Sequence, residues 1–124
     1  MLFRSAETFS GIKIENLDDA KKSCEYFIEK GVNSVFITLS SDGVFCGNKE
    51  KSLHIPGVEI DIVNATGAGD AFMSGIMYGF MNDLDIEETA KFSVGASILA
   101  LSHKNTINPN LSEDLINKTI KELI

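Results

Sequence analysis

Residues 66–70, with the sequence Thr-Gly-Ala-Gly-Asp, have the composition of a loop that binds a phosphate group. They follow an alternating apolar and acidic segment typical of a strand and precede an apolar segment typical of a helix. In that order, the backbone N–H groups at the helix start and the helix dipole point at one spot. Gly67 and Gly69 allow a tight turn and a close approach by an anion, and Ala68 keeps the loop small. The segment therefore predicts an anion site.

Asp70 suggests what the anion site could do. A carboxylate facing a phosphate would repel it, so a useful position is beside the anion, where it can accept a proton from an attacking hydroxyl. The N–H groups of Gly67, Ala68 and Gly69 would then hold the charge on the transferred phosphoryl group. The alternative is a tight turn in which Asp70 only stabilises the helix N-terminus. The segment is neither a Walker loop nor a full GxGxxG fingerprint.

The composition limits the classes of partner. The chain has 124 residues, 44% of them hydrophobic, which is enough for one globular domain. Its net charge of −7 offers no basic surface, so we expect no nucleic-acid partner. No signal peptide or membrane span is evident, so we expect a cytoplasmic protein without a membrane partner. Cys24 and Cys46 are predicted to be buried free thiols, and His54 and His103 receive no role.

The first half of the chain predicts a helix followed by a sheet. Asn16 can cap a helix whose apolar residues recur at steps of three and four until Gly31 ends it. Residues 34–39 form an apolar run expected for a buried strand. Residues 44–46 and 52–55 are predicted to form an antiparallel ribbon around a polar tip. This order indicates the α/β class.

The second half predicts a strand and three helices. The strand at 58–63 leads into the anion loop, and the helix at 70–81 is apolar round most of its surface, which predicts a central helix. The helix at 87–101 carries small residues that allow close approach, namely Gly95, Ala96, Ser97 and Ala100. Ser112 is predicted to cap the last helix, with Leu115, Ile116, Ile120 and Leu123 on one face.

The segment VNATGAGDAF at 63–72, followed by Ser74 and Gly75, resembles the carboxy-terminal signature D-T-x-G-A-G-D-x-F of the ribokinase-like (PfkB) sugar and nucleoside kinases. The resemblance implies the carboxy-terminal portion of a three-layer α/β/α sandwich, with ATP and Mg²⁺ as cofactors. It implies Asp70 as catalytic base and Gly67, Ala68 and Gly69 as anion hole. It also implies a K⁺ site beside Asn64 and Thr66, although many members have Asp where this chain has Asn64.

Two further segments continue the resemblance. Thr38, Ser40 and Gly43 match the T-x-G-x-x-G turn under the nucleotide, with Ser40 in place of the first glycine. The alternative is an ordinary strand-to-turn connection. The resemblance implies that the adenine is walled by Ala96, Leu99, Ser102 and Asn105, for which helix packing is the alternative. Residues 101–112 resemble the ending of the pseudouridine kinases within the family.

The resemblance covers only the last part of such a kinase, so we expect one partial domain, 1–124, without the amino-terminal substrate and lid part. Ser5 stands at the magnesium-linked glutamate of the family's N-x-x-E motif, with Glu7 two residues later. The expected function is ATP-dependent phosphorylation of a sugar or nucleoside hydroxyl, with the isolated chain inactive. The alternative is a non-catalytic nucleotide-binding or interaction module. A homodimer through an exposed sheet edge is also expected.

Overall fold

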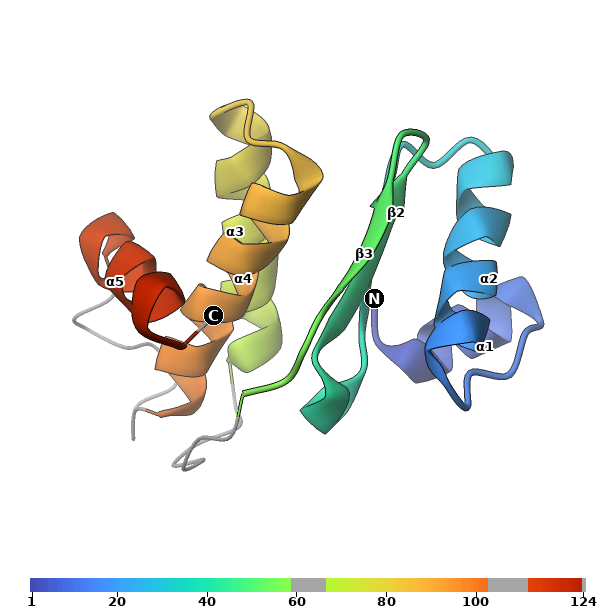
Figure 1. Ribbon diagram of the computed structural model, residues 1–124, viewed down its shortest axis with the longest axis horizontal. Coiled ribbons are helices and arrows are strands. Elements are labelled where there is room, and N and C mark those ends of the chain that lie inside the picture. Colours follow the sequence, from blue (N-terminus) through green and yellow to red (C-terminus); the bar gives the residue numbers. More distant parts are fainter. Residues whose placement is uncertain (59–66, 103–111, 124) are drawn as a thin grey trace. The chain divides into compact units, whose positions relative to one another are not determined.

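The protein has the α/β composition that the sequence predicts. The computed structural model describes residues 1–58, 67–102 and 112–123, and the chain divides into two compact units, Met1–Gly57 and Val58–Ile124. The described residues contain one three-stranded sheet and five α-helices (Figure 1). The expectation of one partial domain stays a prediction.

The sheet of the first unit is antiparallel throughout. Its strands are β1 (Ser34–Thr38), β2 (Val44–Asn48) and β3 (Ser52–Ile55), in the order β1-β2-β3. The register pairs Phe36 with Cys46 and Phe45 with His54. The predicted buried strand and the predicted ribbon around a polar tip are thus both confirmed. The strand at 58–63 falls outside the described residues, apart from Val58.

Helix α2 (Leu17–Glu29) begins and ends as the sequence predicts. The Asn16 side chain accepts a hydrogen bond from the Asp19 N–H at 2.9 Å, which satisfies one of the unpaired donors of the first turn. At the other end, Gly31 has a φ of 102° and donates its N–H to the Ile28 carbonyl. A glycine accepts this left-handed conformation without steric cost, so it ends the helix.

Helix α1 (Phe3–Ser10) was not expected from the sequence. Its N-cap, Leu2, makes no side-chain capping bond, so the usual start signal is missing. The helix ends at Gly11, whose φ is 74° and whose N–H bonds to the Glu7 carbonyl. Its Ser10 hydroxyl accepts a bond of 3.0 Å from the fully buried Ser23 of α2. Contact with α2 therefore takes the place of a local capping signal.

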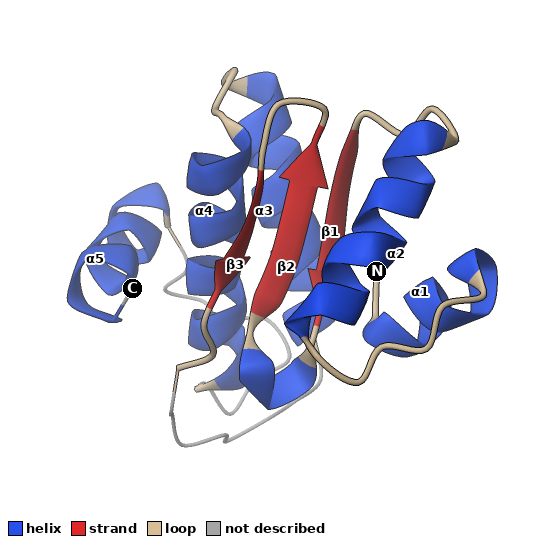
Figure 2. Cartoon of the chain, turned by 45° about the vertical axis from the view of Figure 1, so that its right-hand side comes forward, coloured by secondary structure: helices blue, strands red, loops and turns tan. Residues whose placement is uncertain are grey.

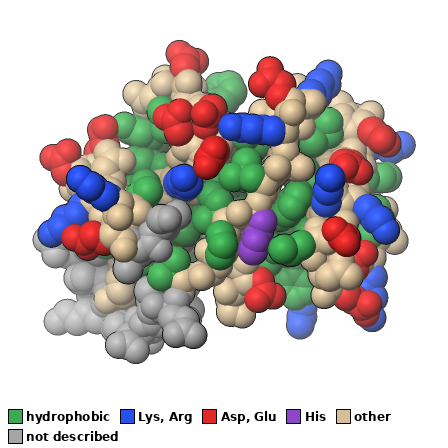
Figure 3. All heavy atoms as spheres, in the orientation of Figure 1, with side chains coloured by type: hydrophobic (Ala, Val, Ile, Leu, Met, Phe, Trp, Pro, Cys, Tyr) green, Lys and Arg blue, Asp and Glu red, His purple; other side chains and the backbone are tan. Residues whose placement is uncertain are grey.

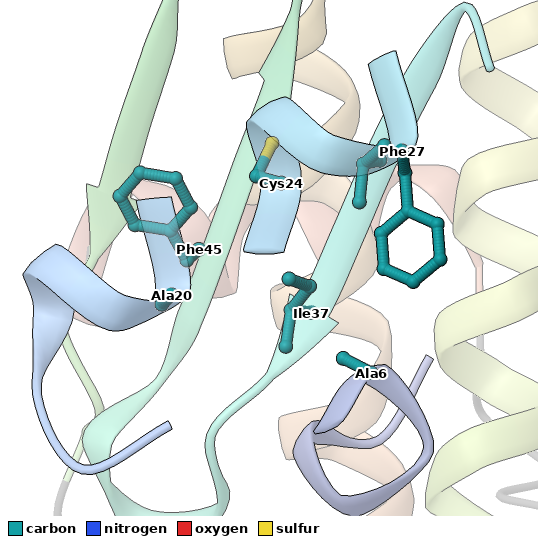
Figure 4. Packing of buried hydrophobic residues seen from close by; sticks show 7 residues of the cluster. Ala6, Ala20, Cys24, Phe27, Ile37 and Phe45 are labelled. Atoms are coloured by element: carbon teal, nitrogen blue, oxygen red, sulfur yellow. The ribbon is translucent and has the colours of Figure 1, made fainter. Parts of the chain in front are cut away.

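The core of the first unit lies between α1, α2 and one face of the sheet (Figure 2). Figure 4 shows the side chains from both helices and from the strands pointing toward one another. The cluster consists of Ala6, Ala20, Cys24, Phe27, Val35, Ile37 and Phe45. Val35 and Ile37 are two residues apart, as the alternation of side chains in a strand requires. This packing fixes β1, at whose end the nucleotide turn is predicted.

Cys24 and Cys46 are free and buried, as predicted. Burial, with a smaller contribution from Glu25, raises the pKa of Cys24 from 9.0 to about 11. Below pH 9 the thiol is protonated in both states, whereas between pH 9 and 11 only the unfolded chain loses the proton. We therefore expect the free energy of unfolding to fall across this range. Denaturant titrations at pH 9 and pH 11 should show a smaller fall in the free energy of unfolding for Cys24→Ala than for the unsubstituted chain. An equal fall in both would contradict the raised pKa of Cys24.

The second unit consists of helices α3 (Ala68–Met81), α4 (Ile86–Leu101) and α5 (Glu113–Leu123). All three are predicted, although α3 begins two residues earlier than its predicted start at residue 70. Asp85 caps α4 by accepting the Glu88 N–H at 2.8 Å. Ser112 caps α5 by accepting the Leu115 N–H at 3.1 Å, which confirms the predicted cap.

Glycines allow the three helices to pack closely. A Cβ on Gly75 would lie 2.5 Å from the Cα of Ser93, and one on Gly79 would lie 2.4 Å from the Thr89 hydroxyl oxygen. Helices α3 and α4 therefore touch along a glycine face. Gly95 faces Ile116 and Ile120 of α5, which confirms the predicted close approach at this small residue.

Helix α3 is not the central helix that its composition predicts. Phe72, Gly75 and Gly79 are buried, but the opposite apolar face is exposed. That face consists of Met73, Met77, Phe80 and Met81, which are 55%, 60%, 84% and 78% exposed. The prediction was wrong because hydrophobicity all round a helix reports what the helix could bury, whereas in the described residues only one face does so.

In the view of Figure 3, Lys and Arg side chains are interspersed with Asp and Glu, so this face has no patch of one sign of charge.

Within residues 1–58, 67–102 and 112–123, no helix has the length and apolar character needed to cross a bilayer.

Candidate functional site

The loop at the start of α3 has the geometry of an anion site. Gly67 is the N-cap residue, with a left-handed φ of 90° that glycine adopts readily, and its carbonyl accepts the Ala71 N–H at 2.9 Å. This is the first bond of the helix, so the N–H groups of Ala68, Gly69 and Asp70 have no partner within the helix. The N-cap residue, Gly67, has no side chain to cap them. The loop thus offers a row of N–H donors and the positive end of the helix dipole.

Gly69 contributes open space. It is exposed, and a Cβ built on it would meet nothing within 4 Å. The left-handed residue of the loop is Gly67, so the conformational requirement for glycine lies there and not at Gly69. The anion-hole prediction for Gly67, Ala68 and Gly69 is compatible with this geometry and stays a prediction.

Asp70 lies in the first turn of α3 and is exposed. Its backbone carbonyl accepts the Ser74 hydroxyl at 3.0 Å, a bond local to the helix. An exposed carboxylate at the helix N-terminus can be reached by an incoming hydroxyl. Its role as base stays a prediction.

The predicted nucleotide turn in the first unit has an unusual backbone. Thr38 ends β1, and its N–H donates to the Met1 carbonyl at 2.8 Å. Ser40 opens a 3-10 turn, Ser40–Asp42, with a φ of 57°, which is uncommon for a residue other than glycine. Serine therefore occupies the left-handed position at which the family pattern has its first glycine. Gly43 closes the turn with a φ of 90°.

Gly43 also packs backbone against backbone. A Cβ on this residue would lie 2.0 Å from the Ile55 carbonyl oxygen and 2.6 Å from the Gly57 nitrogen. The Leu39 N–H reaches across the turn to the Gly43 carbonyl at 2.8 Å. The turn is therefore held against the end of β3, a constraint that no local pattern in the sequence expresses.

His54 is a residue of this region that the sequence analysis missed. Its Nε2 lies 2.6 Å from the Asp42 carbonyl oxygen, within the turn. The predicted ribbon offered one signal, because pairing residues 44–46 with 52–55 brings His54 near the start of β2. The contact itself depends on the shape of the turn.

The remaining candidates lie in α4 or outside the described residues. Ala96 is buried in a cluster with Phe92 and Ile116, and Leu99 packs against that cluster. Their part in an adenine wall stays a prediction. Ser102 ends α4 and donates its hydroxyl to the Ile98 carbonyl at 2.8 Å. The candidates that lie outside the described residues are Asn64, Thr66 and Asn105.

The described residues do not supply a metal site. Nowhere among them do three or more His, Cys, Asp or Glu side chains gather as they would around a metal ion. Glu7, the acid closest to the family's magnesium-linked position, uses its Oε2 to accept the Ile14 N–H at 2.9 Å. It holds the loop between α1 and α2, a structural role.

Comparisons with known proteins agree with these features. The model of the pfkB family carbohydrate kinases matches residues 3–113. The chain is 34% identical to the pseudouridine kinase of Escherichia coli over 109 residues, covering 86% of this chain and 34% of that protein. It is 30% identical to the ribokinase of Haemophilus influenzae over 99 residues, covering 80% of this chain and 32% of the relative. The chain thus spans about one third of the length of these relatives.

Solved structures show the same fold. A Clostridium perfringens protein, solved as a candidate sugar kinase, superposes with a TM-score of 0.93 at 35% identity, covering 99% of this chain and 39% of its own. The ribokinase of Arabidopsis thaliana, solved with ribose and ATP, superposes with a TM-score of 0.84 at 21% identity, covering 97% of this chain and 39% of its own. With its family match over residues 3–113, the chain belongs to the pfkB family of carbohydrate kinases.

Proposed function

We propose that this chain is the carboxy-terminal, nucleotide-binding part of an ATP-dependent kinase that phosphorylates a hydroxyl of a sugar or nucleoside. The observation that carries the proposal is the start of α3, where N–H groups without a partner inside the helix and the exposed Asp70 share one helical turn. Membership of a kinase family supplies the reaction class.

The residues of the loop divide the work of phosphoryl transfer. The oxygen of the acceptor hydroxyl attacks the γ-phosphorus of ATP, and the hydroxyl proton passes to the Asp70 carboxylate. The bond between that phosphorus and the bridging oxygen breaks, and ADP leaves. The N–H groups of Gly67, Ala68 and Gly69 stabilise the negative charge on the phosphoryl oxygens during transfer.

Metal ions are not needed to assign these roles. The family resemblance implies Mg²⁺, which would neutralise phosphate charge, and K⁺ beside Asn64 and Thr66. The described residues contain no cluster that fits a metal, and no step above passes through one.

For the acceptor, pseudouridine is our first candidate, with the 5′-phosphate as product. It is supported by the 34% identity to the E. coli pseudouridine kinase and by the sequence at 101–112. Ribose, fructose-like sugars and other nucleosides are the alternatives. A homodimer through the sheet edge and a cytoplasmic location are part of the same proposal.

A second candidate function is a nucleotide-binding or interaction module without catalysis. It would keep the anion loop at the start of α3 but would need no acceptor site. Both candidates require nucleotide binding, but only the first requires turnover.

The substitution Gly69→Val tests the anion site. A Cβ at this position meets nothing within 4 Å, and valine is no worse than glycine in a helix, so the free energy of unfolding should change by less than about 0.5 kcal/mol. The branched side chain would nevertheless stand where the anion approaches. We expect the dissociation constant for ADP to rise by about tenfold or more in isothermal titration calorimetry.

Met77→Val is the matched control, because it introduces valine at an exposed position of the same helix, away from the loop. It should leave ADP binding unchanged. If Gly69→Val bound ADP as tightly as the unsubstituted chain, the tight-turn alternative would replace the anion site.

We expect the isolated chain to phosphorylate neither sugars nor nucleosides at a measurable rate. In the family, acceptor binding and closure over the site are implied to come from the amino-terminal part, and phosphoryl transfer needs both reactants held in position. A coupled ADP-release assay with pseudouridine, ribose and fructose measures this. Steady turnover of any of them by residues 1–124 would contradict the expectation.

A further inference from the structure

The Ser40–Asp42 turn is held in its shape by contacts of two kinds. The first is backbone packing against the segment that follows β3, since a Cβ on Gly57 would lie 1.8 Å from the Ser41 carbonyl oxygen. The second is a set of backbone bonds that closes the turn, including Gly43 N–H to the Ser40 carbonyl at 3.3 Å. The first kind acts at Ser41, in the middle of the turn, and the second joins Ser40 to Gly43, across its two ends.

His54 reaches the last residue of the turn. Its Nε2 lies 2.6 Å from the carbonyl oxygen of Asp42, a short distance for a hydrogen bond of this kind. A carbonyl can only accept, so the Nε2 atom must carry a proton and donate it. The histidine therefore holds the carbonyl side of the peptide between Asp42 and Gly43, whose N–H side bonds to the Ser40 carbonyl.

The position of His54 also matters. It is half-buried on β3, and with Ser41 and Asp42 it lines an open cavity of about 550 Å³ in the first unit. The strands are held by their own ladder and by the core cluster, to which His54 does not belong. Its bond to the turn is thus an addition to a fold that other contacts already secure.

We infer that His54 is a positioning residue for nucleotide binding. By donating Nε2–H to the Asp42 carbonyl, it keeps the Ser40–Asp42 turn and Gly43 in the conformation that lies under the nucleotide. The inference rests on the proposed function, because the turn matters to activity only if a nucleotide binds there. Strand β3 would thus contribute a side chain that supports nucleotide binding.

Three substitutions at one position test the inference. His54→Ala removes the donor, His54→Gln places an amide N–H close to the position of Nε2, and His54→Asn places one nearer to that of Nδ1. Ser52→Ala, at the start of the same strand, is the control. We expect the ADP dissociation constant, measured by calorimetry on residues 1–124, to rise about five- to tenfold in the Ala and Asn variants. The Gln and Ser52→Ala variants should stay within about twofold of the unsubstituted chain.

Rescue by Gln but not by Asn separates positioning from a general loss of stability, which urea titration monitors in parallel. If the Ala variant bound ADP normally, or if the Gln variant bound as weakly as the Ala variant, the inference would be overturned. Failure of the unsubstituted chain to bind ADP would instead overturn the proposed function.

A measurement without nucleotide keeps the two failures distinct. Nitrogen-15 spectra should show a protonated Nε2 at His54, and the amide signals of Ser41, Asp42 and Gly43 should move in the Ala variant and return in the Gln variant. An unprotonated Nε2, or amide signals of the turn that stay unchanged in the Ala variant, would overturn the role of His54. This holds whether or not the chain binds ADP.

Discussion

Replacing Asp70 by asparagine in the full-length kinase that we propose should lower kcat by roughly 10²–10⁴-fold, the scale of losing a general base. The amide has nearly the same size as the carboxylate but cannot accept the hydroxyl proton. The side chain is exposed in the first turn of α3, so the change disturbs little packing. ATP affinity should stay nearly constant, with a slight gain if removing a charge near the phosphates eases their binding. Initial rates at saturating ATP and acceptor measure the effect.

Asp83→Asn is the matched control. It removes the same charge in the loop after α3, from an exposed residue with a φ of 55°, a conformation that asparagine tolerates. Its kcat should equal that of the unsubstituted enzyme. Near-normal kcat in Asp70→Asn with the best acceptor would remove Asp70 from the role of base, whichever nucleotide binds.

Gly43→Ala should destabilise the first unit by roughly 2–6 kcal/mol, the sum of a positive-φ backbone that favours glycine (φ 90°, ψ −135°) and of overpacking. The new Cβ would lie 2.0 Å from the Ile55 carbonyl oxygen. That oxygen is a backbone atom, so it cannot move away by a side-chain rotation. The turn would have to leave the end of β3. Hydrogen exchange of the amides of β1, β2 and β3 measures the loss of protection.

Gly11→Ala separates the two contributions. Gly11 has a comparable positive φ of 74°, but a Cβ there meets nothing within 4 Å. It should therefore show only the conformational cost, about 1 kcal/mol. If the two variants lost equal protection, the close contact of the turn with β3 would have no energetic weight.

The sequence predicted those elements whose signals are local. The β2–β3 ribbon follows from two β-rich runs around a polar tip, and α2 and α5 follow from their caps, Asn16 and Ser112. Helix α1 was not predicted, because Leu2 makes no capping bond. This helix is stabilised instead by contacts with α2. The exposed face of α3 was not predicted, because the positions of apolar residues around a helix do not show which other elements pack against it.

The candidate site divides in the same way. The anion loop is predicted from residues 66–70 alone, because glycines between a strand and a helix indicate a particular local backbone conformation. The bond between His54 and Asp42 could not be predicted, since it depends on the register of the ribbon and on a left-handed Ser40. The cluster of Ala96 with Phe92 and Ile116 could not be predicted either, since it depends on how α4 and α5 pack.

The exposed face of α3 has a consequence for the protein's response to oxidants. Met73, Met77 and Met81 follow one another at four-residue steps and are 55%, 60% and 78% exposed, whereas the sulfur atoms of Cys24 and Cys46 belong to buried residues. Peroxide should therefore convert thioethers to sulfoxides before it reaches a thiol. Each sulfoxide would turn an apolar patch of this helix into a polar, chiral one, and methionine sulfoxide reductases could reverse the change.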